Sequence, residues 1–196
     1  MKFLEYKLFS GGFINRFLTA GVFTKENPFR KTVLQGKVNE WLIKGYSIHD
    51  NPCRMEVFRD RIGNIPPYMD ICGMLPGDEL EVFGQKKELK VYFPFGNTGI
   101  ADSGFYENPA YLRSYGYTLL EVPEEEEIST CGAVTVWLNE ELVTDFVPFQ
   151  RNSEQHTTVL AALRKGTNKL VVCLEDLAER DTDYHYQIRY LGAQDI

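Results

Sequence analysis

The sequence predicts an all-β protein, an antiparallel β-sandwich with long loops and room for one or two short helices. Short runs rich in β-branched and aromatic residues recur along the 196 residues, bounded by Gly, Pro, Asn or Asp. In the second half of the chain these runs follow one another about every ten residues, a spacing typical of antiparallel sheets. The hydrophobic content of 43% is that of a globular chain. The length suits a single domain over residues 1–196.

The expected strands lie in order along the whole chain. They span residues 2–9, 14–23, 38–43, 79–83, 89–93, 117–122, 128–138, 142–146, 157–163, 169–174 and 184–191. About eleven strands fit one sandwich or barrel. Long connections at 24–37 and 45–77 make the first half looser than the second.

Two segments carry local signals for a helix. In 157–166, Ala, Leu, Arg and Lys are good helix formers, yet Val159, Ala161 and Leu163 also alternate as in a strand. Periodicity therefore does not decide between a helix and a strand for this segment. In 176–179, an acid at each end fits the capping-box pattern, which predicts a short helical turn.

Charge and hydropathy limit the kinds of partner. The net charge of −7 gives no basic face for nucleic acid or an anionic membrane surface. No apolar run approaches the roughly 18 residues of a membrane span. Glu5 and Lys7 interrupt the apolar N-terminus where a secretory signal needs an unbroken core. The four cysteines contain no Cys-x-x-Cys pair, which favours reduced, structural thiols. We expect a cytoplasmic protein with no nucleic-acid or membrane partner.

Four segments between 116 and 174 carry a family resemblance. They read Tyr-Thr-Leu-Leu-Glu-Val-Pro at 117–123, Cys-Gly-Ala-Val-Thr-Val-Trp-Leu-Asn at 131–139, Asp-Phe-Val-Pro-Phe at 145–149 and Lys-Gly-Thr-Asn-Lys-Leu-Val-Val at 165–172. Their order resembles that of the galactose-binding-like jelly-roll domain at the front of β-galactosidase-like and other multidomain glycoside hydrolases. The resemblance covers about a third of the chain and implies a jelly roll, the N-terminal module of a longer protein.

The turn residues of these segments have a physical reason of their own. Asn139 tolerates the positive φ of a hairpin turn, and Gly166 and Asn168 suit a second tight turn. Glu140 stands where the family has Gly, which predicts a longer turn or one of another type. These motifs specify a fold and carry no catalytic residue.

The candidate ligand site is the aromatic segment 92–115, which we expect to be a long loop. Sugars present C–H faces to aromatic rings and hydroxyls to planar polar groups, and this segment offers both. The candidate residues are Asp102, Tyr106, Asn108, Tyr111, Arg113 and Tyr115. The alternative is that these aromatic residues pack the loop onto the sandwich or onto a neighbouring domain.

Other chemistry has little support in the sequence. The nucleophile elbow, the Walker loop, the dinucleotide-binding glycine motif and the His-Glu-x-x-His motif do not occur. Glu175 and Asp176 begin an acidic cluster that could offer oxygen ligands to calcium, although a solvated acidic loop, or an ion pair with Arg180, is the default interpretation. We predict no catalytic residue, no resident metal and no cofactor.

The function that follows is a noncatalytic carbohydrate-binding or accessory module associated with glycoside-active enzymes. Its partner would be a carbohydrate or a neighbouring catalytic domain. Two alternatives stay open: a glycoside hydrolase or lyase that uses acids on the sandwich, and a structural subunit that self-associates.

Overall fold

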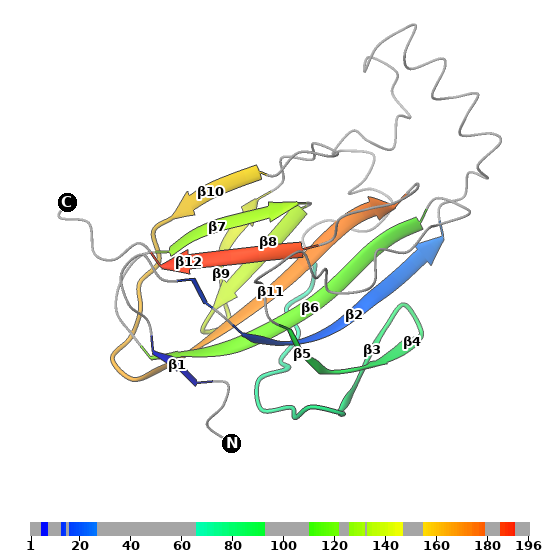
Figure 1. Cartoon of the computed structure of the whole chain (residues 1–196), viewed down its shortest axis with the longest axis horizontal. Helices are drawn as coiled ribbons and strands as arrows, with labels where there is room; N and C mark the ends of the chain where they lie inside the picture. The colour runs from blue at the N-terminus through cyan, green and yellow to red at the C-terminus, as the bar shows by residue number, and fades with distance from the viewer. Residues whose placement is uncertain are drawn as a thin grey trace, which may run out of the picture.

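A computed structural model describes residues 5–7, 13–14, 16–26, 66–92, 110–121, 126–131, 133–146, 155–178 and 185–190 (Figure 1). All regular elements in these ranges are strands, so they contain no helix that could cross a membrane. The strands are β1 (Glu5–Lys7), β2 (Phe17–Glu26), β3 (Glu79–Val82), β4 (Gln85–Glu88), β5 (Lys90–Tyr92), β6 (Ala110–Glu121), β7 (Glu126–Cys131), β8 (Ala133–Leu138), β9 (Glu141–Phe146), β10 (Gln155–Val159), β11 (Thr167–Ala178) and β12 (His185–Tyr190).

The larger sheet has seven strands, and the two central ones, β6 and β11, are the longest. Its order is β5-β2-β6-β11-β8-β9, and β1 pairs in parallel with the end of β6. All the other pairs in the sheet are antiparallel. β6 and β11 pair along their whole lengths, from Ala110 opposite Ala178 to Glu121 opposite Thr167. This pair forms the centre on which the rest of the domain is built.

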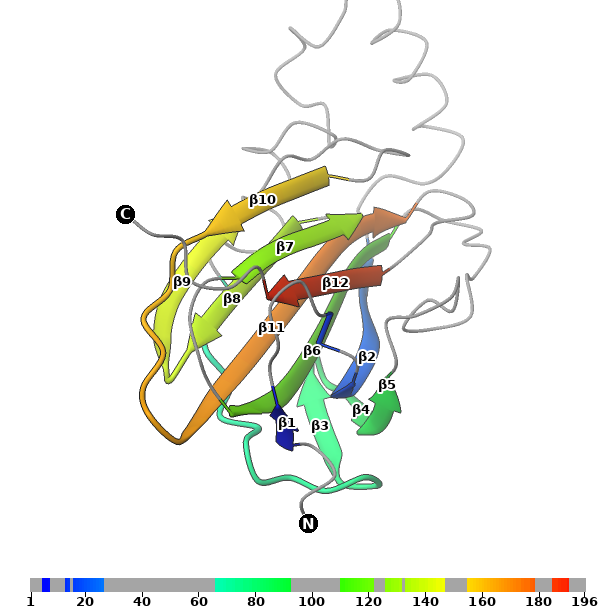
Figure 2. The same cartoon turned by 60° about the vertical axis from the view of Figure 1, so that its left-hand side comes forward.

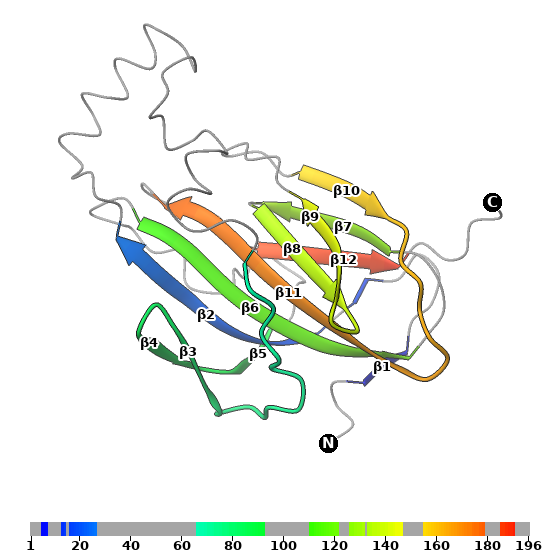
Figure 3. The same cartoon turned by 180° about the vertical axis from the view of Figure 1, so that it is seen from behind.

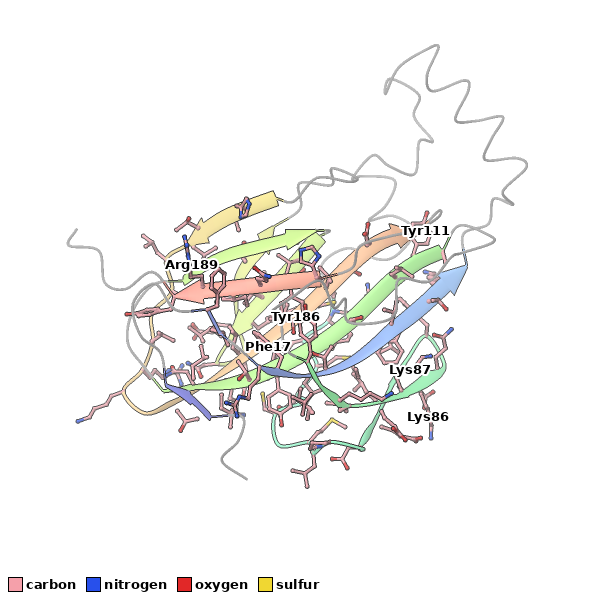
Figure 4. All side chains as sticks on the ribbon, viewed as in Figure 1. Phe17, Lys86, Lys87, Tyr111, Tyr186 and Arg189 are labelled. Atoms are coloured by element: carbon pink, nitrogen blue, oxygen red, sulfur yellow. The ribbon has the colours of Figure 1, made fainter. Side chains whose placement is uncertain are left out.

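A three-stranded antiparallel sheet, β10-β7-β12, packs on one face of the larger sheet. Figures 1 and 2 show its strands running across those of the larger sheet. Tyr186 and Ile188 of β12 share one core with Val136 of β8 and Val172 of β11. The rings of Phe17 and Tyr186 meet edge to face between the sheets, with centroids 5.0 Å apart (Figure 4).

Gly116 makes room for the ring of Tyr186. A Cβ at Gly116 would collide with the Tyr186 hydroxyl and lie 2.9 Å from Oγ1 of Thr19. The same hydroxyl lies 3.4 Å from Thr19 Oγ1, within hydrogen-bond distance. A glycine at this point of β6 therefore lets a large side chain of the second sheet reach the backbone of the first.

A second core lies on the opposite face of the larger sheet, where segment 66–78 and the β3–β4 hairpin cover it (Figure 3). Leu80 and Val82 of the hairpin are buried there. Gln85 of β4 fastens the hairpin to Thr24 of β2: its Nε2 donates to the Thr24 carbonyl at 3.1 Å, and its Oε1 accepts from the Thr24 N–H at 2.9 Å. The larger sheet is thus covered on both faces.

The two cores explain the alternation of residues along the central strands. Val134, Val136 and Leu138 of β8 face the first core, and Trp137 faces the second. In β11, Val172 and Val171 divide between the two cores in the same way.

The β8–β9 turn keeps two residues in spite of Glu140. Asn139 has φ 51° and Glu140 has φ 75°, and Leu138 pairs with Glu141 across them. Positive φ at both positions is what a type I′ hairpin needs. The prediction for Asn139 is confirmed, and the prediction that Glu140 makes the turn longer or of another type is wrong.

Several predicted strands differ from the observed ones. The predicted run 128–138 is two strands in different sheets, β7 and β8. β4 was missed because Gln-Lys-Lys-Glu contains no β-branched or aromatic residue.

The helical turn predicted at 176–179 is wrong for 176–178, since these residues belong to β11 and pair with 110–112 of β6. In the undecided segment, β10 ends at Val159 and 160–164 form no regular element. The predicted strand 38–43 lies outside the described residues.

Candidate functional site

Half of the predicted ligand residues lie on the central strand β6. Asp102, Tyr106 and Asn108 are outside the described residues. The prediction of a long loop over 92–115 is wrong from Ala110 onward, because strand β6 begins at this residue. Its residues Tyr111, Arg113 and Tyr115 are buried, with 1%, 5% and 1% of their surface exposed.

Arg113 forms a buried ion pair with Glu175, its direct neighbour across the β6–β11 ladder. Arg113 Nε and Nη2 donate to the same Glu175 oxygen, at 2.7 and 2.6 Å. The ring of Phe83, at the tip of the β3–β4 hairpin, lies 5.0 Å from the guanidinium carbon. Burial alone would lower the pKa of Arg113, but Glu175 more than offsets this, so the pKa lies above its ordinary value. The guanidinium therefore stays charged although it is buried.

The two tyrosines of β6 that were predicted ligand residues, Tyr111 and Tyr115, also pack in the sheet. The Tyr115 hydroxyl donates to the carbonyl of Pro67 at 3.4 Å, which ties β6 to the covering segment. Burial raises the pKa of Tyr115. Tyr111 pairs with Lys25 of β2 at the end of the sheet (Figure 4). A ligand could reach these rings only if the covering elements moved away.

The calcium candidates do not converge on one ion. Consecutive residues of a strand project to opposite faces, and Glu175 and Asp176 are consecutive in β11. Glu175 is held by Arg113, and both acids are buried. The described residues contain no cluster of three or more His, Cys, Asp or Glu side chains that could hold a metal ion.

The described cysteines are free thiols that pack in or against the second core. Cys173 is fully buried in the second core, and Cys72 is half-buried beside it. Burial raises the pKa of Cys173 well above its usual value and that of Cys72 to about 11. Both thiols are therefore protonated at neutral pH, as structural cysteines are.

A surface groove of about 340 Å³ lies where the β8–β9 hairpin faces segment 160–164. The described residues include four large apolar side chains that are more than a third exposed, and two of them, Leu142 and Leu160, line this groove. Arg164 and Glu141 stand at its rim, with Nη2 and Oε1 4.0 Å apart and both side chains mostly exposed. We call this feature the hairpin groove.

Both walls of the hairpin groove are joined by one buried amide. Asn168, with none of its surface exposed, accepts from the Arg164 N–H at 2.9 Å and donates to the Arg164 carbonyl at 2.9 Å. The same side chain accepts from Asn139 Nδ2 at 2.9 Å and donates to the Gly166 carbonyl at 3.0 Å. Asn139 belongs to the hairpin wall and Arg164 to the other wall, so Asn168 holds the two together.

The sequence did not point to the hairpin groove. Leu142 is followed by Val143, and the sequence does not indicate which of these two apolar residues is exposed. Leu160 lies in the segment where the periodicity did not decide between helix and strand. The one available signal was the Lys-Gly-Thr-Asn motif at 165–168, which predicted a turn but not what the turn supports.

Comparison with known proteins gives little further information. No protein-family model matches the chain, and no curated protein matches it. Among solved structures, two of β-glucosidase from Kluyveromyces marxianus are similar. The selenomethionine-labelled structure matches with 15% identity over 45% of this chain and a TM-score of 0.31; the glucose complex matches with 14% identity over 61% and a TM-score of 0.35. The matches span 12% and 16% of the β-glucosidase chains, and TM-scores this low do not establish a shared fold.

Proposed function

We propose that this chain is a noncatalytic accessory module that binds carbohydrate, built as a jelly roll of the galactose-binding-like kind. One observation carries the proposal. The two turns of the sequence resemblance lie side by side, with Asn139 directly after β8 and Asn168 at the start of β11, and these two side chains are hydrogen-bonded to each other. Asn139 Oδ1 also accepts from the Lys169 N–H at 3.0 Å.

This arrangement makes the two turn motifs part of one hydrogen-bonded unit. A resemblance based on two separate turns could arise by chance, since Gly and Asn favour turns in any fold. Here the two segments, 29 residues apart, form one hydrogen-bonded unit between neighbouring strands. Their joint structure supports the resemblance more strongly than either turn alone.

The acid content of the hairpin groove favours a binding role there over a hydrolytic one. Glycoside hydrolysis needs two carboxyl groups roughly 5 to 9 Å apart across a cleft. In the hairpin groove, Glu141 is the one acid among the described lining residues. The buried Glu175 is neutralised by Arg113. A single exposed acid beside an arginine suits recognition of hydroxyl groups.

The direct test is a glycan array probed with the labelled chain, together with a reducing-sugar assay on the same glycans. We expect binding to at least one class of glycan and no release of reducing sugar. A chain that binds no glycan at any tested concentration would exclude the carbohydrate-binding function. Release of reducing sugar, abolished by Glu141→Gln, would instead establish the hydrolase alternative.

A further inference from the structure

Strand β10 is an outer strand of the three-stranded sheet (Figures 1 and 2). It pairs with β7 over all five of its residues, from Gln155 opposite Thr130 to Val159 opposite Glu126. Within the described part of the chain, no other strand pairs with β10 and no other backbone hydrogen bond reaches it. Every second residue of an outer strand points its N–H and C=O away from the sheet, so β10 offers a row of backbone donors and acceptors to a further strand.

Other outer strands of the described sheets carry features that discourage pairing. β4 reads Gln-Lys-Lys-Glu, and β5 has only three residues. β9 contains a bulge at Val143 and carries Glu141 and Asp145. On β12, at the opposite edge of the sheet that contains β10, the Ile14 N–H donates to the Ile188 carbonyl at 2.8 Å. Charges, short length, bulges and covering segments are the means by which proteins keep an edge from pairing with another chain.

Among the described residues, β10 has none of these protecting features. Its sequence, Gln-His-Thr-Thr-Val, contains no Lys, Arg, Asp, Glu or Pro. Its pairing with β7 runs in register without a bulge. Val159 packs against the first core, so the strand is already held in place before a partner arrives. An edge of this composition is the kind to which a further strand adds.

The charges of the chain and the sequence of β10 favour a second copy as the partner. Two copies with a net charge of −7 repel each other, so a contact between them is favoured where the strand itself adds no like charge. In an antiparallel pair about a two-fold axis at Thr157, Thr157 lies opposite its own copy, and His156 lies opposite Thr158 of the partner subunit. Cross-strand Thr pairs stabilise a sheet, and no like charges meet. We infer that two copies of this chain pair through β10 and join their three-stranded sheets into one continuous sheet. This inference is independent of the proposed carbohydrate binding.

The first test measures the oligomeric state of the full chain. The dimer is expected to be weak, because two strands of five residues bury less than the roughly 1,200 Å² of a stable interface. Sedimentation velocity and NMR translational diffusion should give a dissociation constant between about 10 µM and about 1 mM. A chain that stays monomeric up to about 1 mM would overturn the inference and leave this edge to a strand of another protein.

Two double variants then test the register at His156 and Thr158, which are both exposed. His156→Lys combined with Thr158→Lys places lysines opposite each other at both crossings, and should weaken the dimer about threefold to tenfold. His156→Glu combined with Thr158→Lys places a glutamate opposite a lysine at both crossings, and should tighten the dimer by about the same factor. Both variants share Thr158→Lys, so the opposite outcomes depend on the residue that lies across from it.

The control has the same added charge at other edges. Val91→Lys on β5 combined with Leu142→Lys on β9 changes two exposed residues and raises the net charge as much as the double lysine variant of β10 does. It should leave the dissociation constant within about twofold of the unmodified chain. Circular dichroism checks that each variant is folded. A dimer that is unaffected by both β10 variants, or weakened equally by the control, would overturn pairing through β10.

Discussion

Replacing Asn168 by alanine removes four hydrogen bonds from one fully buried side chain. Each is worth about 0.5–1.5 kcal/mol net, so their sum is near 4 kcal/mol. Water can reach part of the exposed Arg164 and Gly166 backbone after the change, which recovers some of this loss. We expect Asn168→Ala to lower the free energy of unfolding by about 3 kcal/mol.

Urea unfolding followed by circular dichroism measures this change, with the denaturant slope compared between variants to check two-state behaviour. Thr167→Ala, at the exposed neighbouring position, is the control and should stay within about 0.5 kcal/mol of the unmodified chain. A double-mutant cycle with Asn139→Gly should give a coupling energy of about 1 kcal/mol. A cost below about 1 kcal/mol for Asn168→Ala would refute the role of this amide in joining the two walls.

Three further predictions concern other parts of the fold. Glu140→Gly should raise the free energy of unfolding by about 0.5–1 kcal/mol in urea unfolding, because it relieves a side chain at positive φ; Glu140→Ala, which keeps that φ, should not. Gly116→Ala should cost at least about 2 kcal/mol in the same assay, and adding Tyr186→Phe should restore about half by removing the obstructing hydroxyl. Burial raises the pKa of Tyr92 to about 12, so its contribution to stability is complete below about pH 10 and is lost as pH rises through 12; Tyr92→Phe should flatten the measured pH dependence in this window.

The turns were the most predictable part of the fold. Asn139 was expected to take positive φ, and it does, because a two-residue hairpin sets local requirements that few residues meet. The effect of Glu140 could not be predicted, because the pairing of β8 with β9 on both sides holds the turn at two residues. Strand pairing likewise overrode the helix-capping pattern at Asp176, which lies opposite Leu112 in the central ladder.

The loop predicted for 110–115 proved to be part of a strand for a different reason. Tyr111, Arg113 and Tyr115 have the composition of a sugar site, and composition alone does not distinguish an exposed loop from a buried strand. Their spacing did contain the signal, since every second residue from Tyr111 to Tyr117 is large and these residues are buried. The ion partner of Arg113 could not be found from sequence, because Glu175 lies 62 residues away and meets it only through the strand register.

Because Asn168 joins both walls of the hairpin groove, occupancy of the groove and global folding are thermodynamically linked. The walls face each other only in the folded chain, so a ligand that spans them binds the native state and not the unfolded one. At ten times its dissociation constant such a ligand would add about 1.4 kcal/mol to the free energy of unfolding. Any ligand that binds across the groove is therefore expected to raise the melting temperature of the chain.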